Sequence, residues 1–197
     1  MQTDVVIIGA GPAGCSASIY LSQFGIPHIV VEKDVYPRDK VCGDALSGKV
    51  INQLKKLKPE WVSELKEFSE AFTPSWGVVF SAPDGNDIAI PFKHKPSEAE
   101  HSPGFISKRI DYDNWLFQKL DTNYATVLQN TEVRDVEIQT NGVTVTCAST
   151  TIKAKLVISA EGTRALVAKK YGGYEMERQH HCAGLRAYYD GVTDLHP

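Results

Sequence analysis

The stretch VVIIGAGPAGCSASIYLSQFGIPHIVVE, residues 5–32, decides the fold of this chain. Its first four residues are β-branched and wholly apolar, which is typical of a strand buried on both faces of a parallel sheet. Residues 15–24 carry apolar side chains at helical spacing and precede Gly25, which is placed to end a helix. Residues 28–31, HIVV, are expected to form a second buried strand. The order strand, turn, helix, strand predicts an α/β fold, a Rossmann-like domain with a parallel sheet.

The turn between the first strand and the helix has the glycine spacing of a dinucleotide-binding motif. Gly9 permits a tight turn, Gly11 removes a side chain where a pyrophosphate would approach, and Gly14 allows the helix to pack closely on the strand. The start of the helix offers unpaired N–H groups and the positive end of its dipole to the anion. Pro12 and Ala13 lie in the same turn and are therefore candidates for contact with the cofactor.

Glu32 ends the second strand, 18 residues after Gly14, where a carboxylate can accept hydrogen bonds from ribose hydroxyls. An acid here disfavours a 2′-phosphate, so the expected dinucleotide is FAD or NAD, and spacing does not choose between them. Lys33 closes the unit and is a further candidate. The alternative is a glycine-rich turn in an unrelated α/β protein.

The composition excludes several classes of protein. The 197 residues include 21 basic and 24 acidic residues, for a net charge of −3, and no basic stripe suggests nucleic-acid binding. No apolar run approaches the roughly 20 residues of a membrane span, and the N-terminal region does not resemble a signal peptide. The four cysteines are far apart and form no CxxC pair. We expect a reduced, cytoplasmic location.

Residues 36–47, YPRDKVCGDALS, contain the pattern P-R-x-K-x-C-G. Together with GAGPAG at residues 9–14, this segment resembles the geranylgeranyl reductase family of flavoproteins, which shares its fold with the aromatic-hydroxylase flavin monooxygenases. The resemblance covers nearly the whole chain and is most specific at residues 36–47. It implies FAD as the bound dinucleotide.

The resemblance implies that residues 38–43 approach the flavin. Arg38 and Lys40 would place positive charge beside a ring that becomes anionic on reduction, and Cys42-Gly43 would allow the backbone close to a flat ring. Cys42 is the candidate catalytic residue nearest the reactive ring. The alternatives are a small buried hydrophobe for Cys42 and a solvated loop for the two cations.

Two further motifs agree with this family. Residues 106–116, ISKRIDYDNWL, resemble a family helix start in which Arg109 reaches the cofactor. Residues 155–162, KLVISAEG, resemble a second fingerprint that places Glu161 and Gly162 against the cofactor near its pyrophosphate, although Glu161 replaces the usual Asp. Val133 matches a strand whose backbone lies beside the adenine.

The remaining chain is expected to form short elements. Residues 93–103, with His94 and His101, are expected to be a loop, and no metal site is expected there. Residues 141–142 predict a hairpin turn. The expected helices are 47–57, 61–68, 111–120 and 167–171, and the expected strands are 76–81, 88–92, 126–128, 133–139, 143–147, 152–159 and 182–189.

These elements predict two structural units. Residues 1–72 and 104–176 are assigned to a discontinuous FAD-binding domain, and residues 73–103 and 177–197 to part of a second, antiparallel substrate sheet. Family members continue beyond this point into a third cofactor motif, so we expect the chain to be a truncated N-terminal portion that would be inactive by itself without that motif.

The resemblance implies an FAD-dependent oxidoreductase that reduces C=C bonds of an isoprenoid-type substrate with electrons from NADPH or NADH. A small, lipid-like substrate would suit peripheral contact with a membrane, and no nucleic-acid partner is expected. The alternatives are a flavin monooxygenase or halogenase on the same scaffold, or a non-catalytic nucleotide-binding fragment.

Overall fold

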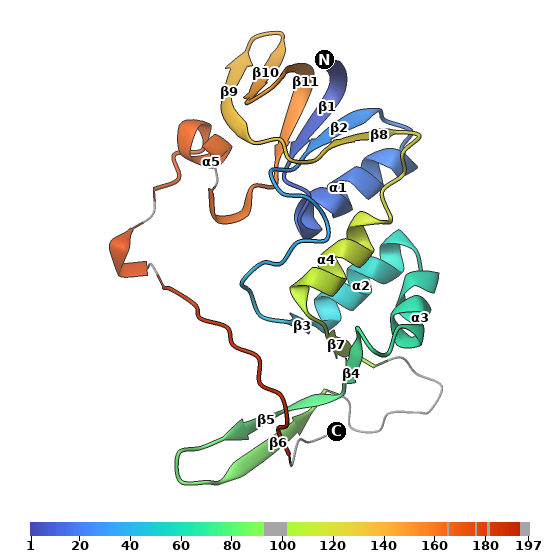
Figure 1. Ribbon diagram of the computed structural model, residues 1–197, viewed down its shortest axis with the longest axis vertical. Coiled ribbons are helices and arrows are strands. Elements are labelled where there is room, and N and C mark those ends of the chain that lie inside the picture. Colours follow the sequence, from blue (N-terminus) through green and yellow to red (C-terminus); the bar gives the residue numbers. More distant parts are fainter. Residues whose placement is uncertain (93–101, 165, 176, 181, 194–197) are drawn as a thin grey trace.

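The computed structural model describes residues 1–92, 102–164, 166–175, 177–180 and 182–193. Its largest element is a six-stranded sheet with the order β8-β2-β1-β11-β10-β9 (Figure 1). The sheet contains β1 (Gln2–Ile8), β2 (His28–Val31), β8 (Ala125–Leu128), β9 (Val133–Gln139), β10 (Gly142–Cys147) and β11 (Thr151–Ser159).

Four neighbouring strands of this sheet are parallel. β1 lies at their centre, between β2 and β11, and β8 pairs with the far side of β2. After β1 the chain continues into β2 on one side of it. The strand on the other side, β11, comes from a distant part of the sequence. In open α/β sheets the crevice for a ligand forms at the carboxyl ends of the strands where such a reversal occurs. This topology places the candidate site after Ile8, Val31 and Ser159.

Helix α1 (Pro12–Gln23) covers one face of the parallel strands (Figure 1). It begins three residues before the expected start, because Gly11 is its N-cap and Pro12 occupies the first turn. Ile7 and Val30 belong to the core cluster on this face. Ser18 on the helix also hydrogen-bonds the buried His28 of β2 at 2.6 Å, which satisfies both polar groups in the core.

The same core cluster continues into three further helices, which lie beyond α1 in Figure 1. Apolar residues at helical spacing face one another, and Leu54, Val62, Leu65 and Leu116 are almost fully buried. Trp61 and Trp115 meet edge to face with ring centroids 5.8 Å apart. The helices are α2 (Gly48–Leu57), α3 (Glu60–Glu67) and α4 (Arg109–Phe117).

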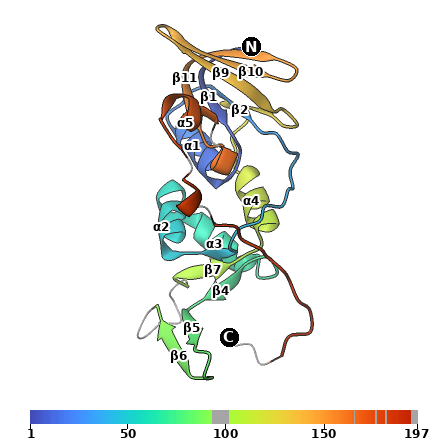
Figure 2. The same cartoon turned by 90° about the vertical axis from the view of Figure 1, so that its left-hand side faces the viewer.

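A second core cluster lies against the other residues of the parallel strands. Val6 and Ile29 alternate with the residues that face α1. They belong to a cluster with Val136 of β9, Val145 of β10 and Ile152 of β11. Figure 2 shows β9 and β10 as a hairpin beside β11, as the turn at residues 141–142 predicted. Helix α5 (Leu166–Tyr171) supports β9, because the Tyr171 hydroxyl donates to the Val136 carbonyl at 2.9 Å.

Two smaller antiparallel sheets follow, and they confirm the mixed α/β class with a parallel sheet and separate antiparallel strands. One contains β3 (Ala45–Leu46), β7 (Gly104–Ile106) and β4 (Thr73–Ser75). The other is the expected hairpin, β5 (Gly77–Ser81) with β6 (Asp87–Pro91). Phe80 and Ile88, which face each other across this hairpin, are both more than 60% exposed.

The expectation of a strand at residues 182–189 is wrong for the structure described. Figure 1 draws this segment as an extended red trace that runs from the short turn Arg178–His180 toward the hairpin. Its backbone pairs with no strand of the described residues, so Leu185 is 99% exposed. Single 3-10 turns lie at Gly162–Arg164 and Arg178–His180. None of the helices in the described part of the chain combines the length and apolar character needed to cross a bilayer.

Candidate functional site

The glycine turn contains two positions that have no room for a side chain and one that faces open space. A Cβ on Gly14 would lie 1.8 Å from the Gly9 carbonyl oxygen, and one on Gly9 would lie 2.5 Å from the Ala160 oxygen. Gly9 also has a φ of +96°, a conformation that favours glycine. A Cβ on Gly11 would meet only Arg38, with Nη2 3.6 Å away. Gly9 and Gly14 thus serve close packing, whereas Gly11 leaves space for a ligand.

The backbone holds this turn between the two neighbouring strands. The Gly9 N–H donates to the Val31 carbonyl at 2.8 Å, and the Ala160 N–H donates to the Ile8 carbonyl at 2.8 Å. No side chain of the described residues caps α1 at Gly11. The first-turn N–H groups of α1 are therefore available to an anion, at the positive end of the helix dipole.

Glu32 is buried at the end of β2, with 4% of its surface exposed. Its Oε2 accepts the Ala10 N–H at 2.7 Å, and its Oε1 accepts the Asp34 N–H at 3.0 Å. The main chain of Glu32 is also fixed. Its N–H donates to the Leu128 carbonyl at the end of β8, and its carbonyl accepts from the Thr131 N–H just beyond that strand. These bonds hold the carboxylate at the edge of the glycine turn, and its remaining lone pairs can accept hydrogen bonds from a ligand.

Asp113 on α4 organises two arginines. Its side chain is fully buried and binds Arg109 through two hydrogen bonds of 2.7 Å. Its Oδ2 also accepts from Arg38 Nη1 at 2.9 Å. The other terminal nitrogen of Arg38 then faces Gly11. Hydrogen bonding to Asp113, followed by a contact with Cys42, raises the pKa of the Arg109 guanidinium.

The aromatic ring of Tyr36 packs against the guanidinium of Arg38. The guanidinium carbon lies 4.8 Å from the ring centroid, and the ring stacks on Phe117 of α4 with centroids 4.0 Å apart. The Tyr36 hydroxyl donates to the Ala10 carbonyl at 2.6 Å, and the Cys15 thiol donates to the same oxygen at 2.9 Å. Burial raises the pKa of the Cys15 thiol to about 12 and also raises the pKa of Tyr36. Both groups remain neutral and structural near pH 7.

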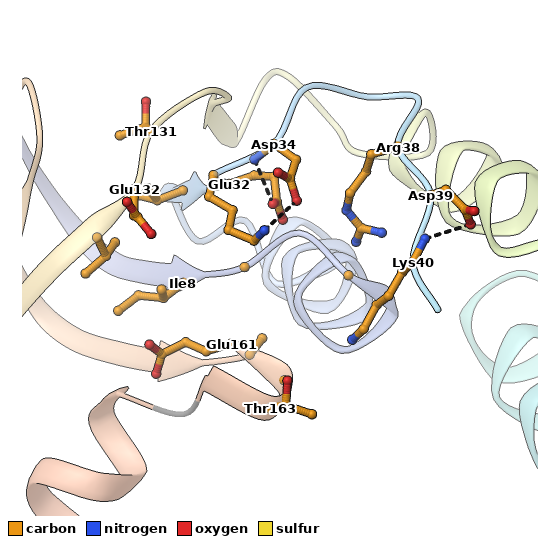
Figure 3. A pocket seen from close by; sticks show the side chains of 17 residues that line it. Ile8, Glu32, Asp34, Arg38, Asp39, Lys40, Thr131, Glu132, Glu161 and Thr163 are labelled. Carbon is orange, nitrogen blue, oxygen red and sulfur yellow. Dashed lines mark hydrogen bonds and ion pairs between the residues drawn. The ribbon is translucent and has the colours of Figure 1, made fainter. Parts of the chain in front are cut away.

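Gly9, Gly11, Glu32 and Arg38 line a pocket of about 260 Å³ at the carboxyl ends of β1, β2 and β11 (Figure 3). Lys40 projects across it, and its Nζ lies 3.2 Å from the position that a Cβ on Gly162 would occupy. We find no ion pair of this ammonium among the described residues. The lining residues are Ile8, Gly9, Gly11, Val31, Glu32, Lys33, Asp34, Arg38, Asp39, Lys40, Thr131, Glu132, Val133, Ala160, Glu161, Gly162 and Thr163.

The decisive comparison is with protein families. A family model described as an FAD binding domain matches residues 2–187. This chain belongs to the FAD-binding domain family. The pocket fits that assignment, because it has a glycine turn with open space at Gly11, a helix N-terminus and two cations on the opposite wall.

Characterised relatives of this FAD-binding domain carry out different reactions. It is 28% identical to a 1H-pyrrole-2-carbonyl-[peptidyl-carrier protein] chlorinase of Pseudomonas fluorescens, over 95% of this chain and 45% of that protein. It is 26% identical to digeranylgeranylglycerophospholipid reductase 1 of Methanosphaera stadtmanae, over 87% of this chain and 41% of that protein. The chain thus spans less than half the length of these relatives.

A solved structure shares the fold of this FAD-binding domain. The halogenase PltM in complex with phloroglucinol and FAD superposes with a TM-score of 0.71 and 22% identity, over 86% of this chain and 36% of that protein. The fold seen here is therefore one that accommodates FAD in another protein.

The FAD-binding domain brings nine of the predicted cofactor residues to one pocket. Those that line it are Gly9, Gly11, Glu32, Lys33, Arg38, Lys40, Val133, Glu161 and Gly162. Six others do not line it, namely Pro12, Ala13 and Gly14 in the first turn of α1, Cys42 and Gly43 in the loop after Lys40, and Arg109 behind Arg38. Arg109 lies behind because its guanidinium binds Asp113.

Glu161 lines the pocket, but its carboxylate is hydrogen-bonded to other groups of this chain. It accepts the N–H groups of Leu166 and Val167, both at 3.1 Å, and the Ser159 hydroxyl at 2.7 Å. It therefore caps the start of α5. In Figure 3 its side chain extends toward this helix. The greater reach of Glu relative to Asp allows this contact.

Cys42, the candidate catalytic residue, is exposed and lies beside Arg109. No group of three His, Cys, Asp or Glu side chains in the described ranges is arranged to hold a metal ion. His94 and His101 lie outside the described residues.

Sequence reasoning missed several residues of the FAD-binding domain's pocket. The missed lining residues are Ile8, Val31, Asp34, Asp39, Thr131, Glu132, Ala160 and Thr163. Three of them, Ile8, Val31 and Ala160, end or directly follow a parallel strand, so the topology would have identified these three. Asp113 was also missed, and its spacing of four residues from Arg109 was the available signal.

Proposed function

We propose that the pocket binds FAD with its diphosphate against Gly11 and the start of α1. The observation that carries this proposal is the open space at Gly11, bounded by Arg38 Nη2 on the other side. A diphosphate needs close backbone approach, N–H donors and positive charge, and all three occur here. The ammonium of Lys40, which forms no ion pair with any residue that the structure describes, lies across from Gly162 and supplies a second cation.

The two ends of the pocket suit the two halves of the cofactor. Glu32 and the segment 131–133 offer acceptors and main-chain groups for the adenosine half. Arg38 and Lys40 stand on the side that continues toward Cys42 and Gly43, where we assign the flavin half. A Cβ on Gly43 would meet nothing within 4 Å, so the backbone there is open to a flat ring.

Bound FAD would accept an electron pair from a donor and pass it to a substrate. The residues of this chain would bind the cofactor, orient it and shield the diphosphate from water. We propose that the electrons come from NADPH or NADH and reduce a C=C bond of an isoprenoid-type, lipid-like substrate. The P-R-x-K-x-C-G segment and the digeranylgeranylglycerophospholipid reductase relative support this assignment.

A flavin-dependent halogenase or monooxygenase is the second candidate. Its support is the chlorinase relative, which matches 95% of this chain at 28% identity. Anaerobic oxidation of NADPH on addition of an isoprenoid substrate would favour the reductase. Dependence of turnover on oxygen and a halide would favour the halogenase.

The cofactor assignment has a direct test. The purified chain is mixed with FAD, desalted and examined by visible absorption. We expect flavin absorbance to remain with the protein at a ratio near one per chain. A colourless, folded protein would contradict the proposal.

A further inference from the structure

Residues 182–189, which we term the crossing segment, bind the loop that carries the pocket's cations. Arg186 Nη1 donates to the Lys40 carbonyl at 2.9 Å and to Asp44 Oδ1 at 3.4 Å. Arg186 Nη2 donates to Asp39 Oδ2. These partners lie more than 140 positions away in the sequence. The single guanidinium therefore joins both ends of the loop 39–44.

Tyr188 adds a second attachment to the same loop. Its hydroxyl donates to Asp44 Oδ2 at 2.8 Å. The guanidinium carbon of Arg186 lies 4.8 Å from its ring centroid, and Lys108 Nζ lies 5.0 Å from it. Both cations thus lie within cation–π distance of the ring.

Arg186 is not part of the pocket lining, but two of its acceptors belong to residues that are. Asp39 and Lys40 both line the pocket. Hydrogen bonding to Arg186 and to the Lys40 N–H lowers the pKa of Asp39, which is therefore charged at neutral pH. Without Arg186, this carboxylate would stand unneutralised at a site for a diphosphate, and like charges at short range oppose binding.

We propose that Arg186 is a positioning residue for FAD, which neutralises Asp39 and holds the loop 39–44 so that Lys40 faces the diphosphate. This inference rests on the proposed FAD site. It assigns a cofactor role to a segment that contributes no group to the pocket itself.

The first test is a charge-rescue series of FAD titrations followed by flavin fluorescence. Arg186→Gln should raise the dissociation constant for FAD about tenfold. Adding Asp39→Asn to this variant should recover most of the affinity, because Asn removes the charge and keeps the Oδ1 acceptor for the Lys40 N–H. Lys155→Gln is the matched control, since it removes an exposed cation whose partner is Asp4, away from the pocket.

Unchanged FAD affinity in Arg186→Gln would overturn the proposal, and so would a loss that Asp39→Asn does not recover. A merely structural role of Arg186 predicts this second result, because neutralising Asp39 would not restore a lost contact.

The second test needs no FAD and separates this inference from the cofactor assignment. Hydrogen exchange of the free chain should be faster at residues 39–44 in Arg186→Gln than in the wild type, and unchanged in Lys155→Gln. Equal exchange would overturn the attachment even if FAD binds. Faster exchange in a chain that does not bind FAD would contradict the proposed function while supporting the attachment.

Discussion

The two walls of the pocket are built by different forces. The glycine turn at residues 9–14 is held by backbone hydrogen bonds and close packing, with a Cβ on Gly14 only 1.8 Å from its neighbour. The opposite wall, residues 38–44, is held by ion pairs that reach Asp113 on α4 and Arg186 in the crossing segment.

The two walls should therefore differ in the kind of substitution that disrupts them. Backbone packing tolerates no added atom but does not depend on charge. Ion pairs tolerate changes of shape but fail when one partner loses its charge, most severely where the partner is buried. Substitutions on the two walls should therefore fail for different reasons.

Gly14→Ala should have the largest effect and prevent stable folding, because its Cβ would overlap the Gly9 carbonyl oxygen. We expect a loss of more than about 4 kcal/mol in the free energy of unfolding. Gly43→Ala is the matched control, since nothing lies within 4 Å of its Cβ position. Urea unfolding followed by circular dichroism measures both, and a stable Gly14→Ala variant would refute the close packing.

Asp113→Asn should come next, because it leaves Arg38 and Arg109 without their buried counter-charge. The expected cost is about 3–5 kcal/mol in the free energy of unfolding, with weaker FAD binding by the protein that remains folded. Asp111→Asn removes the same charge from the same helix and serves as the control. If the two variants are equally stable in urea, Asp113 does not organise this wall.

Glu32→Gln should have a smaller effect. The amide keeps one acceptor and loses the other, so either Ala10 or Asp34 loses a hydrogen-bond partner for its N–H. We expect a loss of about 1–3 kcal/mol in stability and a similar loss in the free energy of FAD binding. Chemical unfolding and isothermal titration calorimetry measure the two effects. No change in either would remove Glu32 from the site.

The effect that is smallest near neutral pH is a pH dependence of the packed wall, which appears only in alkaline solution. Burial raises the pKa of the Cys15 thiol from 9.0 to about 12, so the folded state favours the protonated thiol. Its contribution to stability is complete below pH 9 and is lost between pH 9 and 12, by up to about 1.4 kcal/mol per pH unit. The raised pKa of Tyr36 acts in the same direction at still higher pH.

Cys15→Ser isolates the thiol contribution, because serine keeps a donor for the Ala10 carbonyl and does not titrate in this range. Urea unfolding between pH 8 and 11 should show a shallower loss in this variant. Identical slopes for the wild type and Cys15→Ser would exclude the buried thiol as the cause.

Local patterns predict the packed wall well. Residues 5–32 contain both strands, the helix and the acid that ends the second strand, because each of these depends on neighbours in the sequence. The hairpins also follow from local alternation and turn residues, as the observed β5–β6 and β9–β10 pairs confirm.

The charged wall could not be predicted in the same way. The bond from Arg38 to Asp113 joins residues 75 positions apart, and the bond from Arg186 to Asp39 joins residues 147 positions apart. The family resemblance led us to expect a strand at residues 182–189, but a strand also needs a partner with which to pair. The capping role of Glu161 depends on where α5 begins, which its motif does not specify.

Gly11 is where the two walls face each other, and Gly11→Val tests the cofactor site most directly. A valine Cβ would meet only Arg38 Nη2, at 3.6 Å, and would project into the space assigned to the diphosphate. We predict that Gly11→Val unfolds at the wild-type urea concentration but no longer retains FAD after desalting. A folded Gly11→Val chain that binds FAD as tightly as the wild type would contradict the assignment.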